Sequence, residues 1–331
     1  MPEAYENQND IVLSTRVRLA RNLAEYPFPA RLDIKGRQKV CEAAHAAALA
    51  IAPELEYIDM AELSRAKAVS LAERRLCSAA FAQRDQGGAL LLRKDCRVSV
   101  MLCEEDHIRL QAYAPGLALR EAWELADSVD TAFSRKLNFA FSEQLGYLTQ
   151  CPTNLGTAMR ASVLLHLPAL ARLGRVGRLA ESISKLGLTI RGAFGEGSDA
   201  EGALFQLSNQ VTLGITEQAA LENLQAITLQ IAEQERLAQR ELLKDPAIEN
   251  KVWRALGLLR YARRLDSKEA LQLLSLAALG ACGGALELPL DAIYQLMTDV
   301  LPATLSLDPA AAGDRDAARA TLIRERLKAE S

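Results

Sequence analysis

Arginine residues inside strand-like segments are the first feature of this sequence that could do chemistry. Ser14, Arg16 and Arg18 alternate along a β-branched run, so in a strand their side chains share one face. Three more arginines stand in or beside strand-like or loop segments: Arg109, Arg160 and Arg191. A guanidinium binds phosphate oxygens through a planar fork and keeps its charge. Five of them, converging beside paired carboxylates, could hold a polyphosphate, although each alone could be a solvated charge at a strand edge.

The segments around these residues predict a mixed α/β region. Strand-like alternation covers residues 11–18, 98–102 and 203–210, and helical spacing covers 36–51 and 121–133 between them. These strands are the elements that must position the arginines. We therefore expect a short polar tail over residues 1–10 and a catalytic domain over residues 11–216.

Beyond Thr216 the pattern becomes helical. Apolar residues recur at helical spacing up to Asp245-Pro246, which is a helix stop signal. Further helical segments follow at residues 248–265, 267–279 and 290–300, and a last charged helix runs to about residue 328. We expect an all-helical C-terminal domain over residues 217–331.

Composition excludes several classes of protein. Half of the 331 residues are hydrophobic and 24% are charged, which excludes a disordered chain. The 39 Lys and Arg residues are balanced by 42 Asp and Glu residues, so bulk charge does not favour nucleic acid. The longest apolar run, residues 273–286, is too short to span a bilayer, and the N-terminal tail does not look like a signal peptide. Six scattered cysteines without a C-x-x-C pair predict a reduced, cytoplasmic protein without a zinc site.

Five motifs in a fixed order make the chain resemble a known family. They are Ser14-Thr15-Arg16-Val17-Arg18, Glu104-Glu105-Asp106-His107-Ile108-Arg109, Cys151-Pro152-Thr153-Asn154-Leu155-Gly156, Arg160-Ala161-Ser162-Val163 and Arg191-Gly192. Together they are similar to those of the phosphagen (guanidino) kinases. The resemblance implies an α+β fold, in which a mainly antiparallel sheet flanked by helices forms the catalytic domain.

Within that superfamily the chain resembles the bacterial protein arginine kinases, the McsB family. Only 13 residues precede Ser14, and the helical region follows the catalytic domain instead of preceding it. The hexapeptide from Arg315 to Ala320 also fits the R-D-x-x-R-A motif of that family. The resemblance implies that Arg315, Asp316, Arg319 and Ala320 bind phosphoarginine as an allosteric signal. Without that context, arginines at this spacing usually form a solvated helix face.

The resemblance also implies a reaction, in which the γ-phosphoryl group of ATP is transferred to an arginine nitrogen of a protein. A guanidinium must lose a proton to become a nucleophile. Glu105 is then the leading candidate for base and clamp, Glu196 is the second carboxylate and Cys151 is the reactive cysteine. From residue types alone, Glu105 could equally belong to an exposed acidic turn, and Cys151 could be a small buried hydrophobe.

The implied ATP-binding residues fall into three groups. They are Ser14, Thr15, Arg16, Val17 and Arg18; Arg75, Arg109, Arg160, Ala161, Ser162, Val163 and Leu164; and Arg191, Gly192, Ala193, Phe194, Gly195 and Glu196. Since the sequence shows no carboxylate cluster, we expect Mg²⁺ to be held mainly by phosphates and water. Two positions depart from the family, which usually has Asn where Cys103 stands and His where Arg75 stands.

Partners follow from the resemblance alone. They are protein substrates with exposed arginines, the activator McsA, the heat-shock repressor CtsR and the ClpC–ClpP protease, with a homodimer formed through the helical domain. Two alternatives stay open: a kinase for free arginine or another small guanidine, and a catalytically weak adaptor that binds phosphoarginine.

Overall fold

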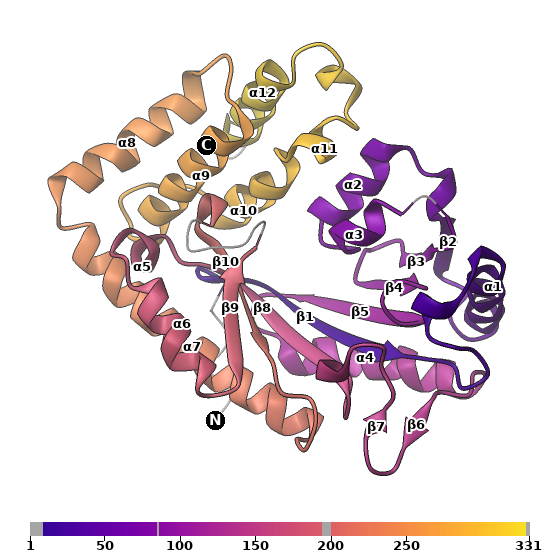
Figure 1. The fold of residues 1–331 in the computed structure, drawn as a ribbon. Coiled ribbons are helices and arrows are strands. Elements are labelled where there is room, and N and C mark those ends of the chain that lie inside the picture. Colours follow the sequence, from indigo (N-terminus) through magenta and orange to yellow (C-terminus); the bar gives the residue numbers. More distant parts are fainter. Residues whose placement is uncertain (1–8, 85, 194–199, 329–331) are drawn as a thin grey trace. The chain divides into compact units, whose positions relative to one another are not determined.

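The computed structural model describes residues 9–84, 86–193 and 200–328 (Figure 1). Eight strands form one sheet in the order β2-β3-β4-β5-β1-β8-β10-β9. In chain order they are β1 (Val12–Arg21), β2 (Leu55–Asp59), β3 (Ala89–Arg93), β4 (Val98–Leu102), β5 (Ile108–Pro115), β8 (Met159–His166), β9 (Leu188–Gly192) and β10 (Leu204–Asn209). A separate hairpin is formed by β6 (Phe141–Ser142) and β7 (Gly146–Tyr147).

Some of the helices alternate with these strands along the chain, and the others follow the last strand. Those of the first two thirds are α1 (Ile34–Ile51), α2 (Arg65–Glu73), α3 (Ala79–Ala82), α4 (Leu119–Ser134), α5 (Pro168–Arg172) and α6 (Val176–Ser184). The C-terminal region contains α7 (Glu217–Leu242), α8 (Pro246–Tyr261), α9 (Ser267–Cys282), α10 (Leu290–Asp299), α11 (Pro302–Leu305) and α12 (Arg315–Lys328). This arrangement confirms the predicted α+β class. None of the helices in the described part of the chain is both long and apolar enough to cross a membrane.

The chain separates into two compact units. Unit 1 contains residues 1–13, 164–207 and 227–331, and unit 2 contains residues 14–163 and 208–226. Helix α7 begins at Glu217, the first residue of the predicted helical domain. The predicted division of the chain at 216/217 stays a prediction.

Unit 2 is built on antiparallel strands. Strands β2 to β5 pair in succession, and β5 pairs with β1 in a register that sets Arg16 opposite Tyr113 and Arg18 opposite Gln111. Helix α4 lies along β1 and β5, and its buried positions Leu119, Ala122, Ala126, Val129 and Phe133 recur every three or four residues (Figure 1). One face of these strands is thereby covered by an apolar helix.

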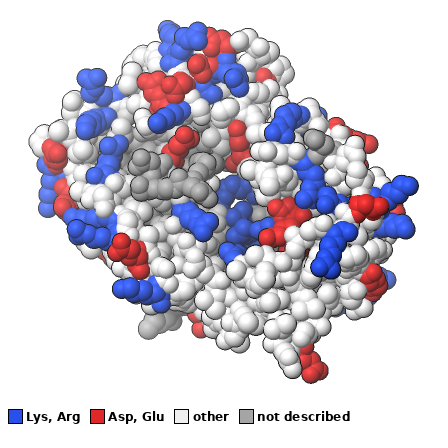
Figure 2. Space-filling model, in the orientation of Figure 1, with Lys and Arg blue, Asp and Glu red and all other residues white. Residues whose placement is uncertain are grey.

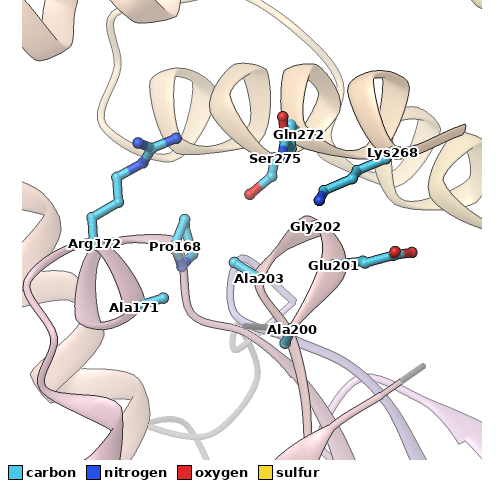
Figure 3. Close-up of a pocket in the computed structure, with 10 residues that line it drawn as sticks. All are labelled: Pro168, Ala171, Arg172, Ala200, Glu201, Gly202, Ala203, Lys268, Gln272 and Ser275. Carbon is cyan, nitrogen blue, oxygen red and sulfur yellow. The ribbon is translucent and has the colours of Figure 1, made fainter. Parts of the chain in front are cut away.

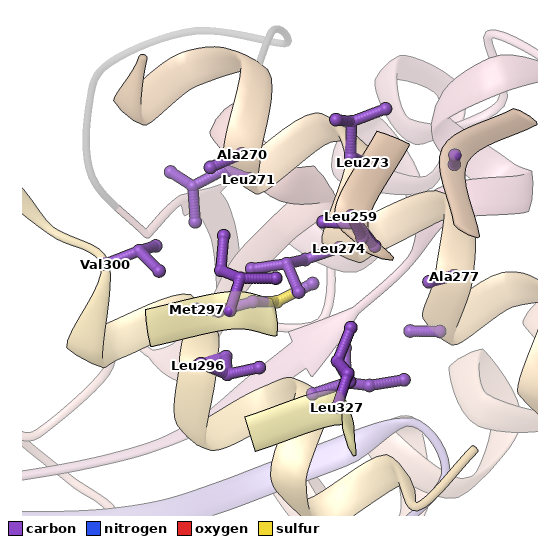
Figure 4. Close-up of a cluster of buried hydrophobic side chains, with 14 of the residues drawn as sticks. Leu259, Ala270, Leu271, Leu273, Leu274, Ala277, Leu296, Met297, Val300 and Leu327 are labelled. Carbon is purple, nitrogen blue, oxygen red and sulfur yellow. The ribbon is translucent and has the colours of Figure 1, made fainter. Parts of the chain in front are cut away.

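Unit 1 contains a core of helices α8, α9, α10 and α12. Its buried side chains are almost all Leu, Ala, Ile, Val and Met, as Figure 4 shows around Leu274 and Met297. A buried polar chain lies against this core: His166 at the end of β8 bonds Ser275 through Nε2 at 2.8 Å and faces the Tyr294 hydroxyl through Nδ1 at 3.3 Å. Burial lowers the pKa of His166 to about 3, so the ring is neutral.

Candidate functional site

The register of β1 and β5 collects polar side chains on one face of unit 2. Directly opposite residues of an antiparallel pair point to the same side of the sheet. Ser14, Arg16 and Arg18 therefore share that side with their partners on β5, which are Pro115, Tyr113 and Gln111, and Arg109 joins them opposite Ala20. The alternation in the sequence predicted the grouping on β1, and the pairing adds β5 to it.

Arg18 is the centre of this cationic face. Its Nε is buried and has no hydrogen-bond partner among the described residues. Burial, followed by repulsion from Arg16, Arg109 and Arg160, holds the pKa of Arg18 well below its ordinary value. A guanidinium that faces three others in a desolvated position is unfavourable unless an anion binds there. We call Arg16, Arg18, Arg109 and Arg160 the arginine cluster.

Arg75 extends the cluster toward β5. It adopts a left-handed backbone conformation, with φ of 65°, at the end of α2. Its carbonyl accepts a hydrogen bond from the Tyr113 hydroxyl. Burial, together with the charge of Arg16, lowers the pKa of Arg75 to about 9. Arg75 is therefore placed beside the phosphate-binding candidates.

The loop from Cys151 to Gly156 is bound to the arginine cluster. Arg160 donates from Nε to Asn154 Oδ1 at 3.0 Å and from Nη2 to the Thr153 hydroxyl at 3.3 Å. The half-buried Cys151 thiol lies 3.1 Å from that same hydroxyl. Gly156 has φ of +98°, and a side chain there would meet the Thr212 carbonyl at 2.2 Å, so only glycine fits. The thiol is accessible, unlike that of a buried structural cysteine.

A pair of glutamates stands directly after β4 and binds Arg109. Arg109 Nη1 donates to Glu104 Oε2 at 2.6 Å and to Glu105 Oε2 at 3.3 Å. Glu104 also accepts from Ser78 Oγ at 2.7 Å. Burial opposes ionisation of Glu104, but Arg109 and these donors outweigh it and lower its pKa. The Glu105 side chain is 34% exposed against 10% for Glu104, so Glu105 is the carboxylate that a substrate can reach.

The segment from Glu104 to Asp106 is not an exposed acidic turn. Asp106 is fully buried, and its Oδ1 accepts from Asn22 Nδ2 at 2.6 Å and from the Gln150 backbone at 2.8 Å. His107 is also buried, with Nδ1 accepting from Leu23 N and Nε2 donating to Pro27 O. Burial lowers the pKa of His107. The hydrogen bonds of Asp106 and His107 thus hold the segment that carries Glu105 in place.

Several predicted ATP-binding residues have side chains that are buried inside unit 2. Thr15 is buried and donates to Gly116 O at 2.7 Å, and Val17 is fully buried. Ala161, Ser162 and Val163 are also fully buried, with the Ser162 hydroxyl 3.4 Å from the Arg16 carbonyl. These side chains support the strands that carry Arg16, Arg18 and Arg160.

The remaining predicted ATP-binding residues belong to unit 1. Leu164 is half-buried on β8, Arg191 is exposed at the end of β9, and Gly192 and Ala193 follow it. Phe194, Gly195 and Glu196 lie outside the described residues. Among the described positions, Leu164, Arg191, Gly192 and Ala193 do not line the pocket of unit 1 in Figure 3, where Lys268 and Ser275 point inward from α9 and Arg172 reaches up from α5.

The predicted phosphoarginine motif begins helix α12. Arg315 is exposed, whereas Arg319 is 2% exposed. Arg319 donates from Nε to Val300 O at 2.9 Å and from Nη1 to Leu265 O at 2.8 Å and Asp316 Oδ1 at 2.7 Å. Ala320 is fully buried. Arg319 therefore ties α12 to the loop between α8 and α9 and to the residue that follows α10, whereas residue types alone predicted a solvated helix face.

In the described part of the chain no three His, Cys, Asp or Glu side chains are grouped as metal ligands. On the face shown in Figure 2, basic and acidic side chains are interspersed. A local cluster of arginines, not a surface field, is thus the anion-binding feature.

Comparison with known proteins identifies the family. The model of the ATP:guanido phosphotransferase C-terminal catalytic domain matches residues 37–238, and that of the protein-arginine kinase McsB C-terminal domain matches residues 245–331. The chain is 45% identical to the protein-arginine kinase of Desulforamulus reducens, over 99% of this chain and 95% of the relative. The chain belongs to the ATP:guanido phosphotransferase family. Another relative, the protein-arginine kinase of Brevibacillus brevis, is 44% identical over 97% of this chain and 92% of its own length.

Solved members of the ATP:guanido phosphotransferase family share the fold. The duplicated taurocyamine kinase of Schistosoma mansoni, with bound transition-state analogue components, matches with a TM-score of 0.62 and 27% identity over 71% of this chain. The matched region spans 34% of that longer chain. Lombricine kinase matches with a TM-score of 0.62 and 20% identity, over 70% of this chain and 68% of its own.

The sequence did not single out several residues that shape this phosphotransferase site. Glu104, Asn154 and Tyr113 each bind a predicted site residue. Glu104 and Asn154 stood inside quoted motifs, where the motif was the available signal. The sequence signal for Tyr113 was weaker: it lies at even spacing from Arg109 on the same strand, which places both side chains on one face.

Proposed function

We propose that this chain transfers the γ-phosphoryl group of ATP to guanidinium nitrogens of arginine in protein substrates. The observation that carries the proposal is the desolvated arginine cluster around Arg18, which lies beside a pair of glutamates that Arg109 holds. Such a cluster suits the charge on a transferring phosphoryl group. The names of the relatives support arginine as the acceptor.

The arginines would act on the phosphates. Arg16, Arg18 and Arg160 stand where a triphosphate can contact several guanidiniums at once, so negative charge that moves from the transferring group to the leaving group stays compensated. Mg²⁺ bound to the nucleotide would add further charge compensation. Because the described residues offer it no ligand cluster, phosphates and water would hold most of its coordination shell.

Glu105 would act on the acceptor. Its carboxylate can align a substrate guanidinium and accept a proton from it as the nitrogen attacks phosphorus. Glu104 would keep Glu105 in place through their shared partner Arg109. Cys151, next to the loop that Arg160 binds, would add a thiolate that orients the acceptor guanidinium. Glu196 would supply the second carboxylate.

The wider role proposed for the chain follows from its family. Phosphoarginine would mark proteins for the ClpC–ClpP protease, and the repressor CtsR would be one substrate. McsA would activate the kinase, a homodimer would form through the helical domain of residues 217–331, and Arg315 with its motif would sense phosphoarginine. The chain would act in the cytoplasm.

The test is phosphotransfer to an unfolded protein. We expect incubation with ATP and a denatured protein to yield phosphate on arginine that acid removes, because phosphoramidates hydrolyse in acid while phosphoserine largely survives. Glu105→Gln should lose the product and still bind ATP. Glu124→Gln, at an exposed carboxylate paired with Arg120, is the matched control and should behave as wild type. Faster transfer to free arginine than to protein would favour a small-molecule kinase instead.

A further inference from the structure

Two of the six cysteines form a pair in unit 2. Cys41 lies on α1, and Cys103 directly follows β4. Both are buried, with 3% and 0% of their surface exposed, and their thiols are close enough for each to shift the pKa of the other. The sulfur of Cys103 also lies 3.6 Å from the Arg37 carbonyl, one helical turn before Cys41. The fold therefore brings together two thiols from distant parts of the sequence, and both are reduced.

The Cys103 thiol donates to the Arg37 carbonyl, and the contact between the two thiols lowers the pKa of Cys41 while it raises the pKa of Cys103. The Ala89 backbone and the charge of Arg84 also favour a Cys41 thiolate, whereas burial and Asp59 oppose it. The thiolate is the form of cysteine that reacts with oxidants. Cys41, which also lines a surface pocket, is thus the candidate nucleophile, and Cys103 is the neighbour that can resolve it.

A surface pocket gives small molecules access to Cys41. Besides Cys41, its lining is Gln38, Tyr57, Asp59, Ala61 and Gln86 to Gly88. All of these residues lie in unit 2, and the pocket is separate from the arginine cluster.

We propose that Cys41 and Cys103 form a dithiol that hydrogen peroxide oxidises to a disulfide. The Cys41 thiolate attacks one peroxide oxygen, which breaks the O–O bond, gives Cys41 sulfenic acid and releases hydroxide. The Cys103 sulfur then displaces the sulfenic oxygen, which leaves as water once it has taken the Cys103 proton. The proton that Cys41 lost when it became a thiolate converts the hydroxide to water, so in total two thiols lose two hydrogens and one peroxide becomes two waters. A thiol reductant reverses the reaction.

The position of Cys103 connects this modification to the proposed active site. Glu104 follows it in the chain and binds Arg109, while Arg84 donates to the carbonyl of Cys103. A disulfide bond is about 2.05 Å long, much shorter than a hydrogen-bonded sulfur contact, so α1 or residue 103 must move when it forms. The movement displaces the residue next to the glutamate pair. This consequence rests on the proposed function, whereas the disulfide does not.

Peptide mapping of the full chain tests the disulfide. The protein is treated with hydrogen peroxide, remaining thiols are blocked with iodoacetamide, and the digest is analysed without reduction. We expect a cross-linked peptide pair that contains Cys41 and Cys103, is lighter than the two free peptides by two hydrogens, and disappears on reduction with dithiothreitol. Oxidation of the half-buried Cys151 in the same sample shows that the oxidant was active.

Variants at the pair provide the controls. Cys41→Ala and Cys103→Asn should form no cross-link, and Asn tolerates the left-handed conformation that residue 103 adopts, with φ of 59°. Cys282→Ala, on α9 in unit 1, should form the cross-link as wild type does. The proposal is overturned if both cysteines stay alkylatable after Cys151 has reacted, or if either one pairs with a different cysteine.

Phosphotransfer measured after the same treatment tests the connection to the active site. Part of the activity that wild type loses should result from oxidation of Cys151, and the Cys41→Ala variant should lose that part as well. We expect wild type to lose at least twofold more activity than Cys41→Ala, and the excess to return with dithiothreitol. Equal losses would refute the connection, even where the mapped disulfide forms.

Discussion

Arg18→Met should stabilise the protein and weaken ATP binding at the same time. In the absence of an anion, Arg18 holds a buried Nε without a partner and faces three other guanidiniums. Methionine keeps an apolar side chain of similar reach and removes both unfavourable features. When ATP is bound, the same substitution removes a charged phosphate contact.

The change in the free energy of unfolding and the change in ATP affinity can be estimated separately. A buried donor without a partner costs about 1–3 kcal/mol, so the free energy of unfolding should rise by about that amount. For a domain of 150–250 residues this raises Tm by about 2–4 °C per kcal/mol. A hydrogen bond to a charged group contributes about 1.5–3 kcal/mol, which corresponds to an increase of the ATP Kd by about 10- to 150-fold.

Urea unfolding and ATP titration calorimetry measure these quantities. The buffer must contain no phosphate, because an anion in the cluster would stabilise wild type by mass action. Urea is preferred to guanidinium chloride because an ionic denaturant screens the repulsion. The control is Arg120→Met, whose side chain is 89% exposed and should change the unfolding free energy by less than about 0.5 kcal/mol. A less stable Arg18→Met, or an unchanged ATP Kd, would refute the reasoning.

Three further predictions address the glutamate pair and unit 1. Glu105→Gln should lower kcat by about 10²- to 10⁴-fold with little change in ATP Kd, and a wild-type rate would remove Glu105 as the base. Arg319→Met should lower the free energy of unfolding in urea by about 1–3 kcal/mol, since it leaves the Val300 and Leu265 carbonyls without their donor. The control Arg315→Met, at an exposed position, should change it by less than about 0.5 kcal/mol. Equal effects of the two substitutions would contradict the burial of Arg319. The His166 pKa is depressed from 6.5 to about 3, so its contribution to stability is fully present above pH 6.5 and is lost as the pH falls toward 3, by about 1.4 kcal/mol per pH unit. His166→Gln should reduce that slope in urea unfolding between pH 6.5 and 5, while His45→Gln should keep it.

Local patterns predicted much of the fold. The strand expected at residues 98–102 is β4, and the helix expected at residues 267–279 is α9 over Ser267–Cys282. Alternation along β1 placed Arg16 and Arg18 on one face, because side-chain direction in a strand depends only on residue parity. These are properties that neighbouring residues determine.

Burial and pairing between distant segments could not be predicted. Glu104 to Asp106 looked like a solvated acidic turn, yet Asp106 is buried because Asn22 and the Gln150 backbone supply donors from elsewhere in the chain. Arg315 and Arg319 look alike in sequence, but only Arg319 meets carbonyls of other helices. The contact between Cys41 and Cys103 likewise depends on α1 lying against the end of β4. Each depends on a partner that sequence spacing does not specify.

The opposite sides of β1 impose a constraint on how its length can change. Thr15, Val17 and Leu19 are buried on the helix-covered side, and the arginines alternate with them. Insertion or deletion of one residue within this strand would invert its orientation, driving two guanidiniums into apolar packing and turning valine and leucine outward. Changes of two residues would preserve the sides but shift the cations along Gln111 and Tyr113. Among natural and engineered variants, β1 should therefore tolerate substitutions at its half-buried positions far better than any change in its number of residues.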